Sequence, residues 1–310
     1  MMGMFFDRAY HFLFSDQRRR LFERLILGIA IAGFSVHLAF IYLIDFGVVS
    51  LETVSPLLKG PIAAAYTPFS FILIYEVYLL VYYLPRSITT YIQKQYEIIT
   101  LIIIRRLFKD LANLQISEDW FTIKGDLMFT YDLVGALVLF FLLYHFERQG
   151  RKREELADTD RPGEGGLERF IRLKKGMAVL LVPILFLVAS YTFVTWSVGA
   201  FFPEHAMVAS FKNINHVFFD EFFGILIVVD VFLLLFSFFV TDDFHKIFRN
   251  SGFIVSTILL RLSFSATGLV SMALVITSVV FGLLVLITFN QFQRAKREEA
   301  EEVDRPAESG

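Results

Sequence analysis

Five charged residues lie inside stretches of sequence that are otherwise strongly apolar. Two are carboxylates, Glu76 and Asp230, and three are arginines, Arg105, Arg106 and Arg261. An ionised side chain at the centre of a lipid bilayer costs roughly 2.5–3.5 kcal/mol on insertion scales, so such a residue faces the protein interior and needs a partner. Two uses are open: an ion pair that fixes how helices pack, or a polar station on a path for protons or small ions.

The carboxylates and the arginines occur twice, in the same order and in similar surroundings. The similar segments are FSFILIYEVYLLVYY and FFGILIVVDVFLLLFSF around Glu76 and Asp230, and ITLIIIRRLF and VSTILLRLSF around Arg105 (or Arg106) and Arg261. The carboxylate precedes the arginine by 29 or 30 residues in the first copy and by 31 in the second. Agreement in residue type, order and spacing indicates an internal duplication.

The depth of each charge predicts the pairs. Glu76 is about 12 Å from either end of its segment at the helical rise, and Arg105 is about 15 Å into a helix that returns from the same side. We therefore predict that Glu76 pairs with Arg105 (or Arg106) and that Asp230 pairs with Arg261. Steep voltage sensing needs about 3–4 gating charges per sensor, and one or two arginines per copy are too few.

Weaker polar candidates are His37 in the first apolar segment and His245, which follows Asp242 and Asp243 at the inner end of the sixth. A histidine titrates near neutral pH, although a hydrogen-bonded packing role is the alternative for both. With no second cluster of ligands, we predict no metal site. The chain has no cysteine and no recognisable catalytic motif, so we predict no cofactor and no enzymatic activity.

Composition identifies the elements that must hold these charges. The 310 residues are 56% hydrophobic and include 37 phenylalanines, and residues 176–203 and 262–293 contain no charged side chain. Runs longer than about 18 apolar residues span a bilayer as helices. The first run, 26–44, is too long for a signal-peptide core and is predicted to be retained. The fold class is therefore an all-α integral membrane protein.

Eight hydrophobic segments are expected. They run at about 24–46, 68–84, 95–110, 127–147, 176–201, 218–241, 250–264 and 266–291. The third segment of each set is short and carries an arginine, so a tilted or partly re-entrant helix is the alternative there. The predicted organisation is an interfacial segment (1–20), a first four-helix repeat (21–147), a polar cytoplasmic linker (148–173), a second four-helix repeat (174–293) and a disordered charged tail (294–310).

The interfacial segment places six apolar side chains on one helical face, typical of a helix on the membrane surface. They are Phe5, Phe6, Ala9, Tyr10, Leu13 and Phe14. An ordinary apolar face packed on the protein is the alternative.

Basic residues predict the orientation. They flank the first span, the linker and the tail, at Arg18, Arg19, Arg20, Arg24, Arg148, Arg151, Lys152, Arg153, Arg172, Lys174, Lys175, Arg294, Lys296 and Arg297. All three regions share one side if each repeat crosses an even number of times, and the positive-inside rule makes that side cytoplasmic. The repeats are then parallel, related by a pseudo-twofold axis along the membrane normal, with both termini inside.

Each copy resembles the phosphate-starvation-inducible E (PsiE-like) family of small bacterial four-helix membrane proteins. The resemblance rests on the carboxylate in an aromatic and aliphatic second span, the arginine after an Ile/Val/Leu run, and final spans that end in RKREE and AKREE. The second copy, with His245 and TILLR ending at Arg261, matches better, although it lacks the proline expected after that histidine. The first copy has Tyr91 and Lys94 in place of the histidine. The resemblance implies a bacterial cytoplasmic membrane and a link to phosphate limitation, but no activity.

Two functions are open at this point. One is a non-enzymatic structural or regulatory membrane protein. The other is a small-ion or proton channel or transporter that uses the pairs Glu76/Arg105 and Asp230/Arg261. The expected partner is the lipid bilayer, with a homo-oligomer and a small ion left open, and the net charge of −2 gives no reason to expect nucleic acid.

Overall fold

The computed structural model describes residues 2–48, 61–111, 124–157, 170–184, 187–188, 210–239, 243–266 and 268–303, and within these ranges the chain forms helices and no strand. The helices are α1 (Met2–Leu13), α2 (Asp16–Asp45), α3 (Pro61–Ala64), α4 (Tyr66–Tyr83), α5 (Ile88–Leu111), α6 (Lys124–Ala157), α8 (Ser210–Phe238), α9 (Phe244–Leu262), the short 3-10 helix η2 (Ser263–Ser265) and α10 (Gly268–Val303). Residues 170–184 are also helical.

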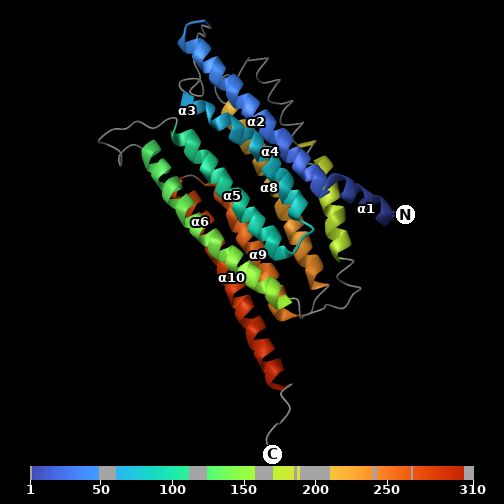
Figure 1. Cartoon of the computed structure of the whole chain (residues 1–310). Coiled ribbons are helices and arrows are strands. Elements are labelled where there is room, and N and C mark those ends of the chain that lie inside the picture. Colours follow the sequence, from blue (N-terminus) through green and yellow to red (C-terminus); the bar gives the residue numbers. More distant parts are fainter. Residues whose placement is uncertain are drawn as a thin grey trace, which may run out of the picture.

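The long helices lie side by side in one elongated bundle (Figure 1). Neighbours along the chain pack in hairpin fashion, α2 on α4, α4 on α5, α5 on α6, α8 on α9 and α9 on α10. The contact between α6 and α10 joins the first half of the chain (2–157) to the second half (170–303). Helix α1 and the last turns of α10 lie toward the same end of the bundle (Figure 1).

Three helices are long and apolar enough to cross a membrane, at Asp16–Asp45, Asp126–Arg151 and Gly268–Glu299. Shorter apolar stretches occupy Thr67–Tyr83 and Phe222–Phe238. On α6, Leu137, Phe140 and Phe141 are 63–68% exposed whereas Asp132 is only 3% exposed. Apolar side chains outside and a carboxylate inside are the pattern of a helix bundle whose solvent is lipid.

The helices extend beyond the apolar segments that the sequence predicted. Helix α5 begins at Ile88 and α9 at Phe244, where the predictions began at 95 and 250. In α5 the reason is visible: Glu97 accepts hydrogen bonds from Gln93 and Lys94 within the same helix, at 2.9 and 2.6 Å. Hydrogen-bonded or oppositely charged side chains three or four residues apart support a helix without apolar side chains.

Two predicted boundaries also need correction. Helix α6 continues to Ala157 and residues 170–173 are helical, so the described ends of the expected linker (148–173) are helical; 158–169 lie outside the described residues. Helix α10 continues to Val303, so residues 294–303 of the expected disordered tail are helical. Both extensions are rich in Ala, Glu, Lys and Arg, which are good helix formers.

Helix α1 packs its last turn on the protein. Phe14 is 5% exposed, its ring stacks 6.0 Å from that of Tyr78 on α4, and the Tyr78 hydroxyl donates to the Leu13 carbonyl at 3.2 Å. Part of the apolar face predicted for 1–20 therefore contacts α4. Phe12 points away and is 59% exposed, and the side chains of Phe5 and Phe6 lie outside the described residues.

Candidate functional site: a buried polar cluster between the halves

A fully buried ion pair joins α8 to α9. Arg261 Nη2 donates to Asp230 Oδ2 at 2.7 Å, and the two side chains are 3% and 0% exposed. Long side chains on a helix lean toward its N-terminus, so Arg261, in the last turn of α9, reaches back into the bundle. The contact has the partners that the comparison of depths predicted.

The pair is completed by helix α5 from the other half of the chain. The Tyr91 hydroxyl donates to Asp230 Oδ1 at 2.9 Å, and Arg261 Nη2 also donates to Gln95 Oε1 at 3.1 Å. Tyr91 and Gln95 are four residues apart and share one helical face, and they are 2% and 3% exposed. We call these four residues the polar cluster. Both oxygens of the Asp230 carboxylate are occupied, one by each half.

A second set of hydroxyl contacts lies beside the polar cluster, where α5, α9 and α10 meet. Tyr96 shares a hydrogen bond with Ser256, and Ser256 and Ser278 exchange hydroxyl-to-carbonyl hydrogen bonds at 2.7 Å in both directions. Gly282 makes room for this contact, because a Cβ at that position would lie 1.9 Å from the Tyr96 hydroxyl. The approach of α10 to α5 therefore requires glycine.

The two adjacent arginines of α5 serve different carboxylates. Glu76 is 5% exposed, and Arg105 is the cation whose charge acts on it. Arg106 instead holds Asp132 on α6 through two hydrogen bonds, one of 2.6 Å to Oδ1. Arg106 is therefore not the partner of Glu76, an alternative that the sequence left open. Consecutive residues project about 100° apart around a helix, so one arginine faces α4 while the next faces α6.

Asp132 is a buried member of an ion pair that sequence reasoning missed. It is 3% exposed, and Arg106 also contacts Ser271 on α10 at 3.5 Å. A signal existed: Asp132 lies about two turns into α6, and Arg106 lies between one and two turns before the end of α5, at comparable depth. The same depth comparison that predicted the other pairs predicts this one.

Neither of the two candidate histidines, His37 and His245, joins the polar cluster. His37 Nδ1 shares a hydrogen bond with the Thr67 hydroxyl, which links α2 to α4. The His245 side chain is 42% exposed and lies 3.5 Å from Asp243. Asp242 lies outside the described residues. Within the described part of the chain, no three His, Asp or Glu side chains come close enough to hold a metal ion.

Asp243 has a structural task at the start of α9. Its carboxylate accepts from the backbone N–H groups of His245 and Lys246, at 3.0 and 3.4 Å, and so caps the helix. Partial burial acts to raise the pKa of this carboxyl, but those two hydrogen bonds and the charge of Lys246 outweigh it and hold the pKa below its ordinary value.

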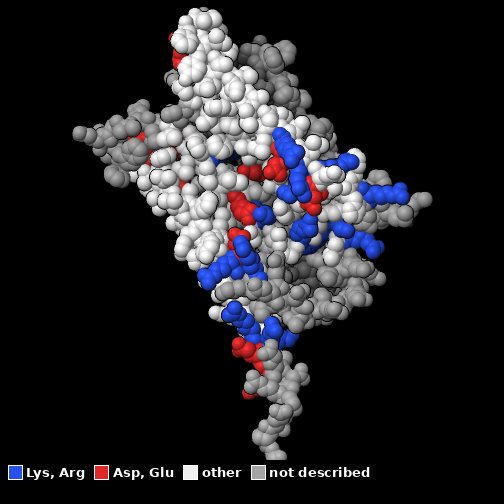
Figure 2. All heavy atoms as spheres, viewed as in Figure 1, with Lys and Arg blue, Asp and Glu red and all other residues white. Residues whose placement is uncertain are grey.

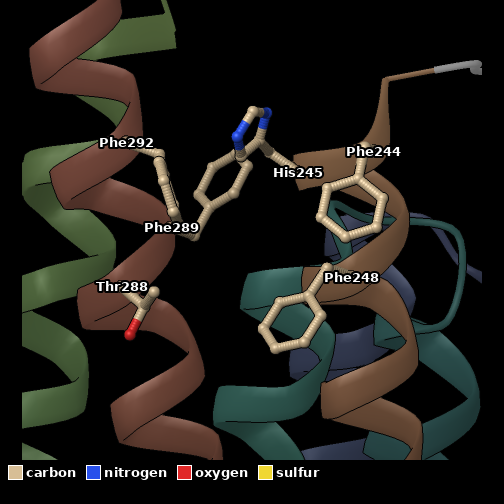
Figure 3. A pocket seen from close by; sticks show the side chains of 6 residues that line it. All are labelled: Phe244, His245, Phe248, Thr288, Phe289 and Phe292. Atoms are coloured by element: carbon tan, nitrogen blue, oxygen red, sulfur yellow. The ribbon is translucent and has the colours of Figure 1, made fainter.

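His245 belongs to an aromatic groove between α9 and α10. The groove has a volume of about 230 Å³ and is lined by Phe244, His245, Phe248, Thr288, Phe289 and Phe292. Figure 3 shows rings from α9 facing rings from α10 across the groove, with His245 at one end. Carboxylates and cations are absent from this lining, so the groove is an apolar surface feature and no part of a polar path.

Comparisons with protein-family models, with curated proteins and with solved structures found no match to this chain.

Proposed function

We propose that this chain is a multi-pass membrane protein with a non-enzymatic, structural or regulatory role, in which the buried ion pairs hold helices together. One observation carries the proposal: the Asp230 carboxylate is 0% exposed, and its two oxygens are bound by Arg261 and Tyr91. A carboxylate that takes part in ion conduction must release its protein contacts in order to bind water or the moving ion. A carboxylate whose partners come from two packed helices is suited to fixing their positions.

Flux measurements test this role. Purified protein in proteoliposomes is expected to carry no proton, potassium or phosphate flux above that of empty vesicles. Flux that is abolished by Glu76→Gln or Asp230→Asn would contradict the proposal and support the channel or transporter instead. Glu76→Gln tests a path through the first half of the chain, and Asp230→Asn tests a path through the second half.

We further propose eight crossings, arranged as two parallel four-helix repeats with both termini in the cytoplasm of a bacterium. The α5–α6 and α9–α10 hairpins support this arrangement, because they occupy equivalent places in the sequence and pack through α6 and α10. Helix α5 has 24 residues and α9 has 19, which correspond to about 36 and 29 Å, lengths comparable to a hydrocarbon core of about 30 Å.

The absence of native cysteine allows a direct test of the topology. Single cysteines at Ser117, Thr159 and Ser309 are treated in intact cells with a reagent that does not cross the membrane. Eight crossings predict labelling at Ser117 alone. Labelling at Thr159 would show that the third segment does not cross, and labelling at Ser309 would refute a cytoplasmic C-terminus.

The PsiE-like relationship and its link to phosphate limitation are part of the same proposal. Their support is the repeated carboxylate-to-arginine spacing and the contact between Asp230 and Arg261. Transcript and protein levels in the native bacterium are expected to rise when phosphate is withdrawn and not when nitrogen is withdrawn. Unchanged levels under phosphate limitation would refute the link.

A further inference from the structure

Cations and aromatic rings gather where α1, α2, the α4–α5 turn and the helix at 170–184 meet. We define the basic patch as Arg18, Arg19, Arg20, Arg86, Lys174 and Lys175. Figure 2 shows Lys and Arg in a band that runs from the region of α1 and α2 to the last turns of α6 and α10, with Asp and Glu among them, whereas the opposite end of the bundle shows almost none on the same face. The patch therefore lies at one end of the lipid-facing surface.

Aromatic rings hold the cations of the patch in place. Tyr82 is the centre: the guanidiniums of Arg19 and Arg86 lie 5.5 and 5.7 Å from its ring, and Arg86 also donates to its hydroxyl at 3.3 Å. Lys175 lies 5.3 Å from the ring of Tyr10 on α1. Cations placed over aromatic faces keep their charge and lose part of their conformational freedom, so the patch is organised before any ligand arrives.

Segments from both halves of the chain build the patch. Lys174 is 7% exposed, and its ammonium donates to the Arg86 backbone carbonyl at 3.2 Å. This contact ties the helix at 170–184 to the turn between α4 and α5. The patch is therefore a property of the folded chain and not of a single basic stretch.

The patch has more positive than negative charge. The charges of Arg19, Arg86 and Arg20 all act on one carboxylate, that of Asp16. Asp16 also accepts a hydrogen bond from Tyr82 at 2.6 Å, which occupies part of its acceptor capacity. Glu23, which accepts a hydrogen bond from Tyr75 at 3.0 Å, is a second carboxylate near Arg19. The six cations of the patch outnumber these two carboxylates and leave a net attraction for anions.

Apolar side chains begin directly beside these cations. On α2, Arg18 and Arg20 are exposed, and the next outward-facing apolar residues, Leu21 and Leu25, are 68% and 55% exposed. An anionic lipid fits this surface, because its head group can contact the arginines while its acyl chains cover the leucines. A free anion or an acidic peptide would leave the leucines uncovered.

We propose that the basic patch binds the phosphate head group of an anionic phospholipid, whose acyl chains lie along the exposed apolar face of α2. Guanidiniums bind phosphate oxygens in pairs and suit this ligand. Tyrosines near the ends of membrane helices are typical of membrane interfaces, and Tyr10 and Tyr82 contact the cations of the patch. The lipid would link α1, α2 and the α4–α5 turn at the membrane surface.

Titration of the full-length protein in neutral detergent micelles with dye-labelled phosphatidylglycerol tests the proposal. The test variant is Arg18→Gln/Arg20→Gln/Arg86→Gln. A cation near an anionic lipid surface contributes about fivefold in affinity, so we expect the apparent Kd to rise by at least about tenfold. Labelled phosphatidylcholine is expected to bind weakly to both proteins.

Two further variants make the outcome specific. Arg294→Gln/Lys296→Gln/Arg297→Gln removes the same charge from exposed positions on α10 and is expected to change the Kd by less than about threefold, since screening weakens distant charges. The triple Arg→Lys replacement of the patch keeps its charge and is expected to retain most of the binding, which separates loss of charge from misfolding. Equal effects of the two Gln triples, equal binding of phosphatidylcholine, or full displacement by excess inorganic phosphate would each overturn the proposal.

Discussion

Removing one member of the Asp230–Arg261 pair is the sharpest perturbation that the structure offers. Arg261→Met keeps an unbranched side chain of similar length in α9 but leaves the buried Asp230 charge without its counter-ion. Asp230→Asn leaves the buried Arg261 charge without its counter-ion. The double variant removes both charges, and an asparagine at 230 can still accept from the Tyr91 hydroxyl.

The magnitudes separate a charge effect from a hydrogen-bond effect. An uncompensated charge inside a membrane domain costs roughly 2.5–3.5 kcal/mol, so each single variant should lose about 3 kcal/mol of unfolding free energy. A neutral hydrogen bond between membrane helices averages only about 0.6 kcal/mol and reaches about 1.7. The double variant, which loses hydrogen bonds but strands no charge, should lose about 1 kcal/mol. It should therefore be more stable than either single variant.

Tyr91→Phe is the matched control, because it removes only the hydroxyl that donates to Asp230 at 2.9 Å. We expect a loss near 1 kcal/mol, well below that of Arg261→Met. Equilibrium unfolding in mixed detergent micelles, followed by circular dichroism, gives the four free energies. Additive losses in the double variant would show that the two charges do not stabilise each other. A Tyr91→Phe loss as large as that of Arg261→Met would refute the ranking of charge over hydrogen bond.

Two further predictions follow from single contacts. Gly282→Ala should destabilise the bundle by about 1–3 kcal/mol, because its Cβ would lie 1.9 Å from the Tyr96 hydroxyl; Gly28→Ala, with no atom within 4 Å, should be neutral or stabilising in the same unfolding assay. Asp243→Ala should cost about 0.5–2 kcal/mol through loss of the α9 cap. Since Lys246 and the cap hydrogen bonds lower the folded pKa of Asp243, its charge stabilises the fold above the ordinary carboxyl pKa of about 3.9. That contribution is lost as the pH falls through the lower folded value. Asp243→Asn, which keeps the cap, should therefore be less stable than the wild type at neutral pH and equal to it in strong acid; a difference that is constant with pH would contradict this.

The sequence predicted the helices and part of the cluster because both follow from local rules. An apolar run of sufficient length must be helical in lipid, and residue counts place Asp230 and Arg261 at similar depth. The start of α5 and the end of α10 were missed because helical segments rich in charged residues look, in sequence, like solvated connectors. Asp132 was missed although its depth relative to Arg106 was available.

Tyr91 and Gln95 could not be assigned to the cluster from sequence. They lie 139 and 166 residues from their partners Asp230 and Arg261, and neither residue type stands out near the start of a helix. Which face of α5 meets α8 and α9 depends on how the two halves pack. That packing depends on many apolar contacts, and no short sequence pattern predicts it.

The two ion pairs Asp230–Arg261 and Asp132–Arg106 both lie at the contact between the halves. Asp230 and Arg261 take their remaining hydrogen bonds from α5, and Arg106, which holds Asp132, reaches Ser271 on α10 at 3.5 Å. Apolar side chains alone would let two such bundles slide past each other in lipid at little cost, because lipid tails are as apolar as leucine. A buried charge has few acceptable partners, so a shift of one helical turn would leave it unpaired. The charged residues that suggested an ion path are thus placed where they fix the register between the two halves of the chain.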